Sequence, residues 1–140
     1  MVQGTSSTSR DTSVRLVQLT PEEDQVLTDA TVIPVKAVVA FNPSLLETVE
    51  YFSTITVNGR PYEPFRVTIT PGAITGTTEM SWFVHVSGKQ MNLQFSLYGI
   101  GQSSGDRRDI AEVWMQYVVR CNPTQFCLVR AMRHLCGCCS

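Results

Sequence analysis

Hydrophobic and polar residues alternate along much of the chain, and this pattern predicts β-strands. The clearest case is residues 91–98, where Met91, Leu93, Phe95 and Leu97 fall on one side of an extended chain. Further strands are predicted over residues 14–19, 31–41, 53–57, 62–70 and 77–87. Each would bury one face, because successive side chains of a strand point to opposite faces of its sheet.

The predicted strand at residues 77–87 shows how the alternation assigns side chains to faces. Its larger apolar residues share one parity and are Met80, Trp82, Val84 and Val86. His85 has the opposite parity. We therefore expect His85 to be a surface histidine with no catalytic role.

The dipeptide Asn58-Gly59 is the strongest turn signal in the chain, since both residues readily adopt positive φ angles. It lies between two segments rich in β-branched and aromatic residues, which predicts a β-hairpin. Pro61 and Pro64 have no backbone N–H and should shorten the strand pairing after this turn.

Two short helical segments are predicted in the first half of the chain. Residues 20–23 combine a cap residue, a proline at the first helical position and a glutamate at the third, which predicts a helical turn. Residues 44–52 have capping-box spacing between Ser44 and Glu47 and predict a short helix. The same segment could equally run into a strand from Tyr51 to Val57.

Two more helices are predicted near the C-terminus. Asp106 can cap the first, over residues 106–118, and Asp109 complements the positive end of its dipole. Its apolar residues recur as a single helical stripe and are Ile110, Val113, Trp114, Tyr117 and Val118. Pro123 ends this element, and a final amphipathic helix is predicted over residues 124–139.

The order of these elements, strands first and helices last, predicts a mainly β fold. We expect a β-sandwich or an antiparallel sheet with one or two short helices and a C-terminal amphipathic helix, and the alternative is an α+β arrangement. The 140 residues suffice for one domain. The predicted organisation is a flexible N-terminal arm (1–13), a single β-rich domain (14–120) and a Cys-rich C-terminal tail (121–140).

Composition supports the strands and limits the functional classes. Val, Ile and Thr make up 38 of the 140 residues, an excess that favours strands. The formal net charge of −1 is unlike that of a basic nucleic-acid-binding protein. The first ten residues are polar and contain no secretory signal, so we expect a cytoplasmic chain with reduced thiols.

The cysteines are the least ordinary feature, because all five lie in the last 20 residues. Cys136, Cys138 and Cys139 follow an amphipathic segment with arginines, a context in which S-acylation occurs. We therefore expect lipidation of these three cysteines and peripheral attachment to an anionic membrane. The expected membrane-contact residues are Leu128, Arg130, Met132, Arg133 and Leu135.

A zinc site is the alternative use of the same segment, whereas the lipid-anchor hypothesis needs no cofactor. Cys121, Cys127, His134 and Cys136 have the ligand types and the number of a closed tetrahedral zinc site. Their C-x5-C-x6-H-x-C spacing differs from that of standard zinc knuckles. Such a site would make the chain a zinc-stabilised binding module, for example a viral host-interaction factor.

A remote alternative is a serine hydrolase. Residues 101–105 (GQSSG) match the G-x-S-x-G nucleophile elbow, with Ser103 as the nucleophile. Asp109 or Glu112 and then His134 follow in the chain order of an α/β-hydrolase triad. The chain has too few predicted helices and too little length for the parallel-sheet scaffold of that class.

Three arginines are candidates for contacts with RNA, namely Arg66, Arg107 and Arg108. A sheet surface that binds RNA combines basic residues with paired aromatic rings. The sequence gives no sign of such a pair beside these arginines, so solvated charge is the preferred interpretation.

Three segments resemble a known family: VIPVKAVVAF (Val32–Phe41), FRVTITPG (Phe65–Gly72) and WFVHVSGKQMNLQFSLYGI (Trp82–Ile100). They are similar to the β-rich core of small matrix proteins from negative-strand RNA viruses, with bornavirus and rhabdovirus matrix proteins nearest. The resemblance implies a sandwich-like domain that self-assembles beneath a membrane and contacts viral ribonucleoprotein. It assigns no role to any individual residue.

The sequence therefore favours a non-enzymatic structural or interaction protein that self-associates and binds a membrane peripherally, as a viral matrix protein does. The expected partners are a second copy of the chain, an anionic membrane surface and viral ribonucleoprotein. No small-molecule substrate is expected. The expected location is cytoplasmic, at a membrane periphery, or within a virion.

Overall fold

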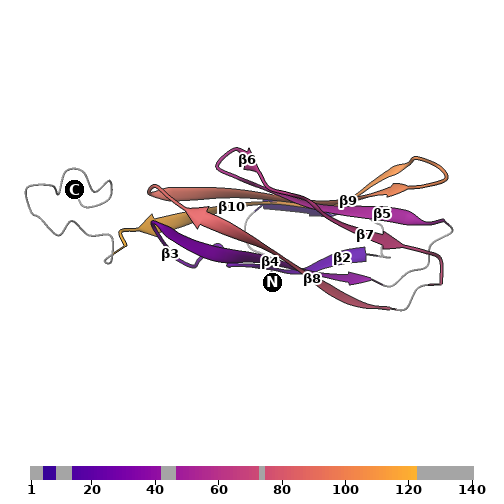
Figure 1. The fold of residues 1–140 in the computed structure, drawn as a ribbon, viewed down its shortest axis with the longest axis horizontal. Helices are drawn as coiled ribbons and strands as arrows, with labels where there is room; N and C mark the ends of the chain where they lie inside the picture. Colours follow the sequence, from indigo (N-terminus) through magenta and orange to yellow (C-terminus); the bar gives the residue numbers. More distant parts are fainter. Residues whose placement is uncertain (1–4, 9–13, 42–46, 73–74, 123–140) are drawn as a thin grey trace, which may run out of the picture.

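The computed structural model describes residues 5–8, 14–41, 47–72 and 75–122, and these ranges contain strands and turns but no helix. The ten strands within these ranges form two sheets that lie one above the other (Figure 1). The prediction of a mainly β fold is therefore confirmed, and the helices predicted within these ranges are wrong.

The larger sheet has seven strands in the order β1-β10-β9-β5-β6, with β3 beside β10 and β7 beside β5. All of its pairings are antiparallel except that of β3 with β10, which is parallel. The strands are β1 (Thr5–Thr8), β3 (Leu27–Thr28), β5 (Val49–Val57), β6 (Arg60–Pro61), β7 (Phe65–Ile69), β9 (Gln90–Gly101) and β10 (Arg107–Arg120).

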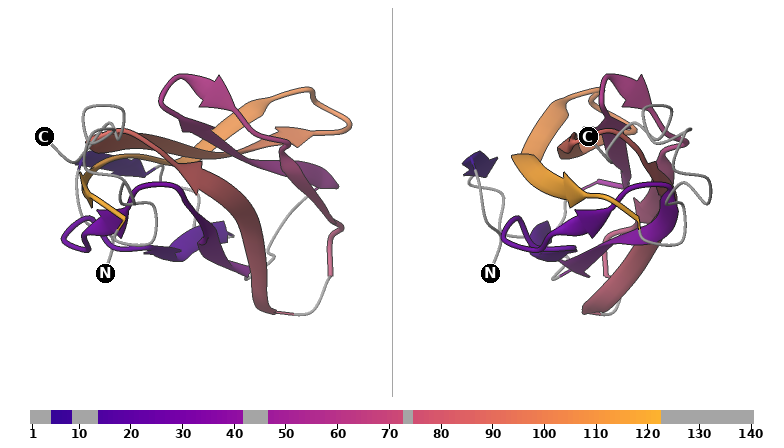
Figure 2. Two further views of the ribbon diagram at one scale, coloured as in Figure 1. Left: turned by 60° about the vertical axis from the view of Figure 1, so that its left-hand side comes forward. Right: turned by 90° about the vertical axis from the view of Figure 1, so that its left-hand side faces the viewer.

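The smaller sheet has three antiparallel strands in the order β2-β4-β8. They are β2 (Val14–Thr20), β4 (Thr31–Phe41) and β8 (Gly76–Val86). β4 and β8 pair along their whole length, which fixes which residues of the two strands stand opposite each other. Figure 2 shows this sheet and the larger one on opposite sides of a shared interior.

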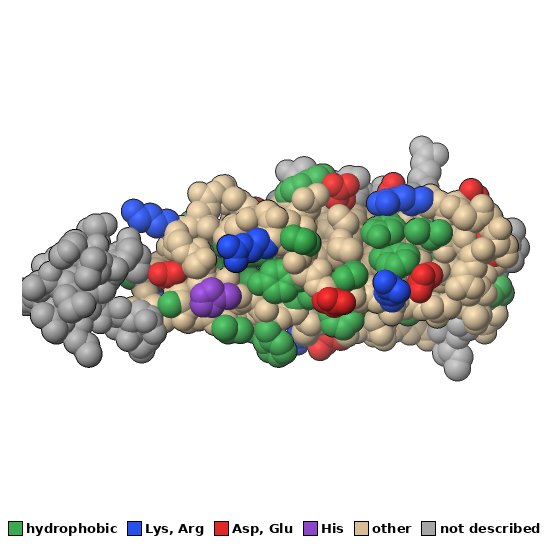
Figure 3. All heavy atoms as spheres, turned by 45° about the horizontal axis from the view of Figure 1, so that its top comes forward, with side chains coloured by type: hydrophobic (Ala, Val, Ile, Leu, Met, Phe, Trp, Pro, Cys, Tyr) green, Lys and Arg blue, Asp and Glu red, His purple; other side chains and the backbone are tan. Residues whose placement is uncertain are grey.

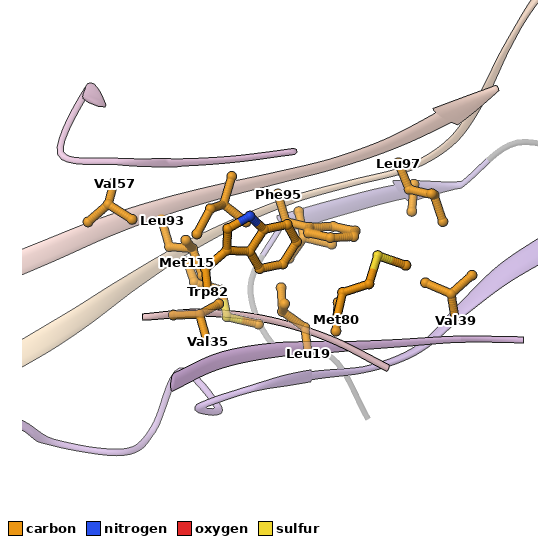
Figure 4. Close-up of a cluster of buried hydrophobic side chains, with 14 of the residues drawn as sticks. Leu19, Val35, Val39, Val57, Met80, Trp82, Leu93, Phe95, Leu97 and Met115 are labelled. Carbon is orange, nitrogen blue, oxygen red and sulfur yellow. The ribbon is translucent and has the colours of Figure 1, made fainter. Parts of the chain in front are cut away.

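The core lies between the two sheets and contains the inner side chains that the alternation predicts. On β9 the residues Met91, Leu93, Phe95 and Leu97 are each at most 2% exposed. Trp82 of the smaller sheet meets Phe95 of the larger sheet edge to face, with ring centroids 6.3 Å apart (Figure 4). Burial of such apolar surface, worth about 25 cal/mol per Å², holds the two sheets together.

The hairpin predicted at Asn58-Gly59 is confirmed. Asn58 has φ 49° and Gly59 has φ 82°, which suits a tight two-residue turn between antiparallel strands. Val57 pairs with Arg60, but β6 ends after only two residues. The pairing with β5 resumes at β7, beyond the second of the two prolines, as expected for residues without a backbone N–H.

The helix predicted over residues 106–118 is wrong, because this segment is strand β10. Val113 and Tyr117 point into the core, whereas Trp114 and Val118 are 41% and 65% exposed on the outer face. The helical spacing of these residues is also compatible with a strand that carries apolar residues on both faces. Pairing with β9 along the strand decides in favour of β structure.

The other predicted helices have mixed outcomes. Residues 20–23 form no helix: β2 ends at Thr20, and a turn follows in which the Gln25 N–H donates to the Glu22 carbonyl at 3.0 Å. In the segment 44–52, the described part leads into β5 from Val49, so the strand alternative is confirmed there. The helix predicted over 124–139 lies outside the described residues.

The N-terminal arm predicted over residues 1–13 contains one element within the described ranges. Residues Thr5–Thr8 pair with β10 as strand β1. This pairing extends the larger sheet by one strand beyond β10.

Candidate interaction surfaces

The residues predicted for lipidation and membrane contact lie outside the described ranges. They are Cys136, Cys138 and Cys139 for lipidation, and Leu128, Arg130, Met132, Arg133 and Leu135 for membrane contact. Within the described ranges there is no helix of the length and hydrophobicity needed to cross a membrane.

Of the four predicted zinc ligands, Cys121 alone lies within the described ranges. Cys121 is disulfide-bonded, so the prediction of reduced thiols is wrong at this position. A sulfur in a disulfide is not the thiolate that a zinc site needs. Cys127, His134 and Cys136 lie outside the described ranges. Elsewhere in the described part of the chain, no group of three or more His, Cys, Asp or Glu side chains could hold a metal ion.

The G-x-S-x-G segment is the turn that joins β9 to β10. A nucleophile elbow needs a turn from a strand into a helix, and here a second strand follows instead. The serines bind a carboxylate: the Ser103 and Ser104 N–H groups each donate to Glu47 Oε1 at 3.0 Å. The Ser104 hydroxyl donates to Glu47 Oε2 at 2.7 Å.

Glu47 is held in this turn by several donors at once. The hydrogen bond from the Ser104 side chain is the largest of the effects that lower the Glu47 pKa, and Arg108 adds to it from 3.5 Å. A Cβ atom at Gly101 would lie 2.5 Å from Glu47 Oε2, so a larger residue there would displace the carboxylate from its present position. The turn thus binds the Glu47 carboxylate, and Ser103 contributes its backbone N–H to this contact.

Four side chains form a row across the outer face of the larger sheet, and we call them the Arg–aromatic stack. They are Arg66 of β7, Phe52 of β5, Tyr98 of β9 and Arg107 of β10. The Phe52 and Tyr98 rings stack with centroids 5.1 Å apart and planes at 18°. The Arg66 guanidinium lies 5.6 Å from the Phe52 centroid, and that of Arg107 lies 4.0 Å from the Tyr98 centroid.

The stack places a pair of aromatic rings beside Arg66 and Arg107, so the expectation that these arginines have no such pair is wrong. The ring faces are occupied, however, because each ring has the other ring on one side and a guanidinium on the other. A nucleobase could stack there only by displacing an arginine, which is unlike the open aromatic platforms of RNA-binding sheets. Arg107 is also paired with Asp109 at 2.8 Å.

A group of exposed apolar residues lies on the outer side of the smaller sheet and the turn beside it. We call it the apolar strip, and it consists of Val26 (56% exposed), Val32 (62%), Pro34 and Phe83 (72%). Pro34 of β4 stands directly opposite Phe83 of β8, and Val32 is the next outward residue on β4. Figure 3 shows one face of the molecule, on which exposed hydrophobic side chains gather in groups with acidic and basic side chains beside them.

Polar and charged side chains border the apolar strip. Lys36 and Glu79 form an ion pair at 3.4 Å on one side, and His85 stands opposite Val32 on the other. A groove of about 310 Å³ separates the strand residue Pro34 from the turn residue Val26. The alternation along β8 could have predicted that Phe83 is exposed, because Phe83 lies on the same face of the strand as the surface residue His85.

Comparison with known proteins identifies no family for the chain. No protein-family model and no curated protein sequence matches it. Among solved structures, it is similar to a Niemann-Pick type C2 protein from the Japanese carpenter ant (9% identity, 81% of this chain and 98% of that chain, TM-score 0.40). It is also similar to the C-terminal domain of wzt (14% identity, 85% of this chain and 75% of that chain, TM-score 0.40). Neither similarity is high enough to indicate a function.

Proposed function

We propose that the chain is a non-enzymatic structural or interaction protein that self-associates and attaches peripherally to a membrane. The observation that supports this most directly is the apolar strip. Val32 and Phe83 are side chains that normally lie in a core, and here most of their surface faces solvent. An exposed apolar patch bordered by polar residues is typical of a protein interaction site.

The partner proposed for the strip is a second copy of the chain. Its border carries both signs of charge in Lys36 and Glu79, so two strips related by a two-fold axis can place opposite charges against each other. The strip is small, and small interfaces give weak and reversible association. We therefore expect self-association that depends on protein concentration.

Membrane attachment is proposed for the C-terminal segment on the basis of its sequence. Cys136, Cys138 and Cys139 would carry acyl chains, and Arg130 and Arg133 would contact anionic headgroups. Self-association would strengthen this attachment, because each added copy brings its own anchor to the same surface. A matrix-like protein on the cytoplasmic side of a membrane or within a virion combines these two properties.

Vesicle co-sedimentation of the full chain, purified from eukaryotic cells that acylate cysteines, tests the proposal. The vesicles contain phosphatidylcholine with or without phosphatidylserine. We expect the wild-type chain to pellet with the anionic vesicles and a chain lacking residues 134–140 to stay in the supernatant. Phe83→Ser should need more lipid for half-maximal binding, because it weakens self-association but keeps the anchor.

The matched control is Val118→Ser, which changes another exposed apolar residue, on the larger sheet, at 65% exposure against 72% for Phe83. It should pellet as the wild type does. The proposal is wrong if the shortened chain pellets as well as the wild type, or if Phe83→Ser and Val118→Ser behave alike.

A further inference from the structure

A second surface, on the larger sheet, has the features of a ligand site. It is a groove of about 570 Å³ whose floor is formed by β9 and β10. Trp114 of β10 stands opposite Gln94 of β9, and Gln116 stands opposite Asn92. These cross-strand pairs place one aromatic ring and three primary amides next to one another on the same face.

Both walls of the groove are fixed by hydrogen bonds to its floor. On one side the β5–β6 turn is fastened to β9, because Asn58 Oδ1 accepts a hydrogen bond from the Asn92 N–H at 2.8 Å. On the other side Glu23 Oε2 accepts one from the Gln116 N–H at 2.9 Å. The groove is therefore already shaped before a ligand enters, which reduces the entropy lost on binding.

The side chains of the groove favour a neutral ligand rich in hydroxyl groups. A primary amide has two donors and an acceptor with two lone pairs, which matches hydroxyls that both donate and accept. Gln94 Nε2 already donates to Glu112 Oε1 at 3.3 Å, and Asn92 Oδ1 already accepts from Gln90 Nε2 at 3.4 Å. A ligand would therefore use the second N–H and the carbonyl of Gln94, and the amide N–H groups and second lone pair of Asn92. Trp114 is 41% exposed, and the electron-rich face of its ring can pack against the C–H groups of a sugar ring. Among the described residues that line the groove there is no Lys or Arg, and Glu23 is the one charged residue, which disfavours anionic ligands.

We propose that this groove binds a neutral carbohydrate, with Trp114 as the stacking platform and Asn92, Gln94 and Gln116 as hydrogen-bonding residues. Single-stranded RNA, which also stacks on aromatic rings, is disfavoured because its phosphates need basic partners, and none is found among the described residues that line the groove. This site is distinct from the apolar strip, since it lies on the outer face of the other sheet.

Tryptophan fluorescence gives a direct measurement of binding to the full chain. The chain has two tryptophans, and Trp82 is 5% exposed with its Nε1–H bonded to the Glu63 carbonyl at 2.7 Å. Quenching by acrylamide will therefore report mainly on Trp114. We expect members of a panel of neutral hexose and N-acetylhexosamine oligosaccharides to protect Trp114 from quenching, whereas sialylated oligosaccharides and poly(U) do not.

Variants then assign the binding to the groove by isothermal titration with the best neutral oligosaccharide. Trp114→Ala should weaken binding about tenfold or more, a loss of about 1.4 kcal/mol, while Trp114→Phe keeps most of it. Gln116→Ala should weaken binding as well, although it retains the N–H that holds Glu23. Val118→Ala, on the same face of β10 but outside the groove, is the control and should bind normally.

Circular dichroism identifies any variant that fails to fold, and Gln116→Ala keeps the test valid if Trp114→Ala is such a variant. The proposal is overturned if no neutral oligosaccharide in the panel binds. It is also overturned if sialylated oligosaccharides or poly(U) bind in preference, or if Gln116→Ala binds as tightly as Val118→Ala. None of these results bears on self-association or on vesicle binding.

Discussion

Glu47 connects the entrance of β5 to the β9–β10 turn across 56 residues of sequence. Its pKa is lowered from 4.5, chiefly by the hydrogen bond from the Ser104 hydroxyl, so the folded state favours the ionised carboxylate. A lowered pKa contributes stability above the pKa of the unfolded chain, and this contribution disappears as the pH falls through the folded value.

Glu47→Gln should therefore lower the free energy of unfolding near neutral pH and have a shrinking effect in acid. The measurement is urea denaturation of both proteins at about pH 7 and about pH 3. We expect the midpoints to differ at the higher pH and to converge at the lower one. A difference that stays constant with pH would show that the charge of Glu47 contributes nothing to stability.

Tyr117 is a fully buried residue of β10 whose hydroxyl donates to the Pro21 carbonyl at 2.6 Å. Tyr117→Phe should cost about 1 kcal/mol of unfolding free energy, because the carbonyl loses its partner. Burial is also the main cause that raises the Tyr117 pKa above its usual 10. The wild type should therefore lose stability as the pH rises above that value, and the variant should lose less.

Thermal or urea denaturation at neutral and alkaline pH measures both effects. Tyr62→Phe, at a half-buried tyrosine outside β10, serves as the control. Equal alkaline losses in the wild type and in Tyr117→Phe would mean that another group causes them.

At the scale of elements, alternation sufficed to predict β9 and the inner face of β8, because each of these strands has one largely apolar and one largely polar face. It failed for β10, where Trp114 and Val118 add apolar residues to the outer face. Helical and strand periodicities then fit the same residues, and only pairing with β9 distinguishes them. That pairing depends on residues distant in the sequence.

Gly99 shows how closely β9 and β5 approach. It stands opposite Tyr51, and a Cβ atom there would lie 2.7 Å from Cε1 of the Tyr51 ring. Tyr51 is 1% exposed, so its ring has little room to move. Gly99→Ala should therefore destabilise the protein by about 1–3 kcal/mol through overpacking.

The control for this substitution is Gly76→Ala at the start of β8, where a Cβ atom would meet nothing within 4 Å. Urea denaturation should show a clear loss of stability for Gly99→Ala and little change for Gly76→Ala. Similar stabilities for the two variants would contradict the close packing of β9 on β5.

At the scale of the whole molecule, the two outer faces differ in chemistry. The smaller sheet and its neighbouring turn carry the apolar strip, and the larger sheet carries the Arg–aromatic stack and the amide-lined groove. The sequence pattern predicted the sandwich because hydrophobic alternation is a local property. It could not predict the stack or the groove, since Phe52 meets Tyr98, and Gln94 meets Trp114, only through strand register.

The two faces would let one molecule bind a copy of itself on one side and a different ligand on the other. Self-association through the apolar strip is the central claim of this account, because the proposed assembly at a membrane requires it in addition to the C-terminal anchor. Phe83 is the most exposed large hydrophobic residue of the described ranges. A substitution at Phe83 therefore tests the claim most directly.

The most direct test is sedimentation velocity of the full chain over a wide range of concentrations without reductant, which leaves the Cys121 disulfide intact. Non-reducing gel electrophoresis of the same samples identifies any intermolecular disulfides. Wild-type chain and Val118→Ser should show a mass that rises reversibly with concentration. Phe83→Ser should require about tenfold more protein, or more, to reach the same mass. A wild type that stays monomeric throughout, or a Phe83→Ser chain that associates as the wild type does, would contradict the account.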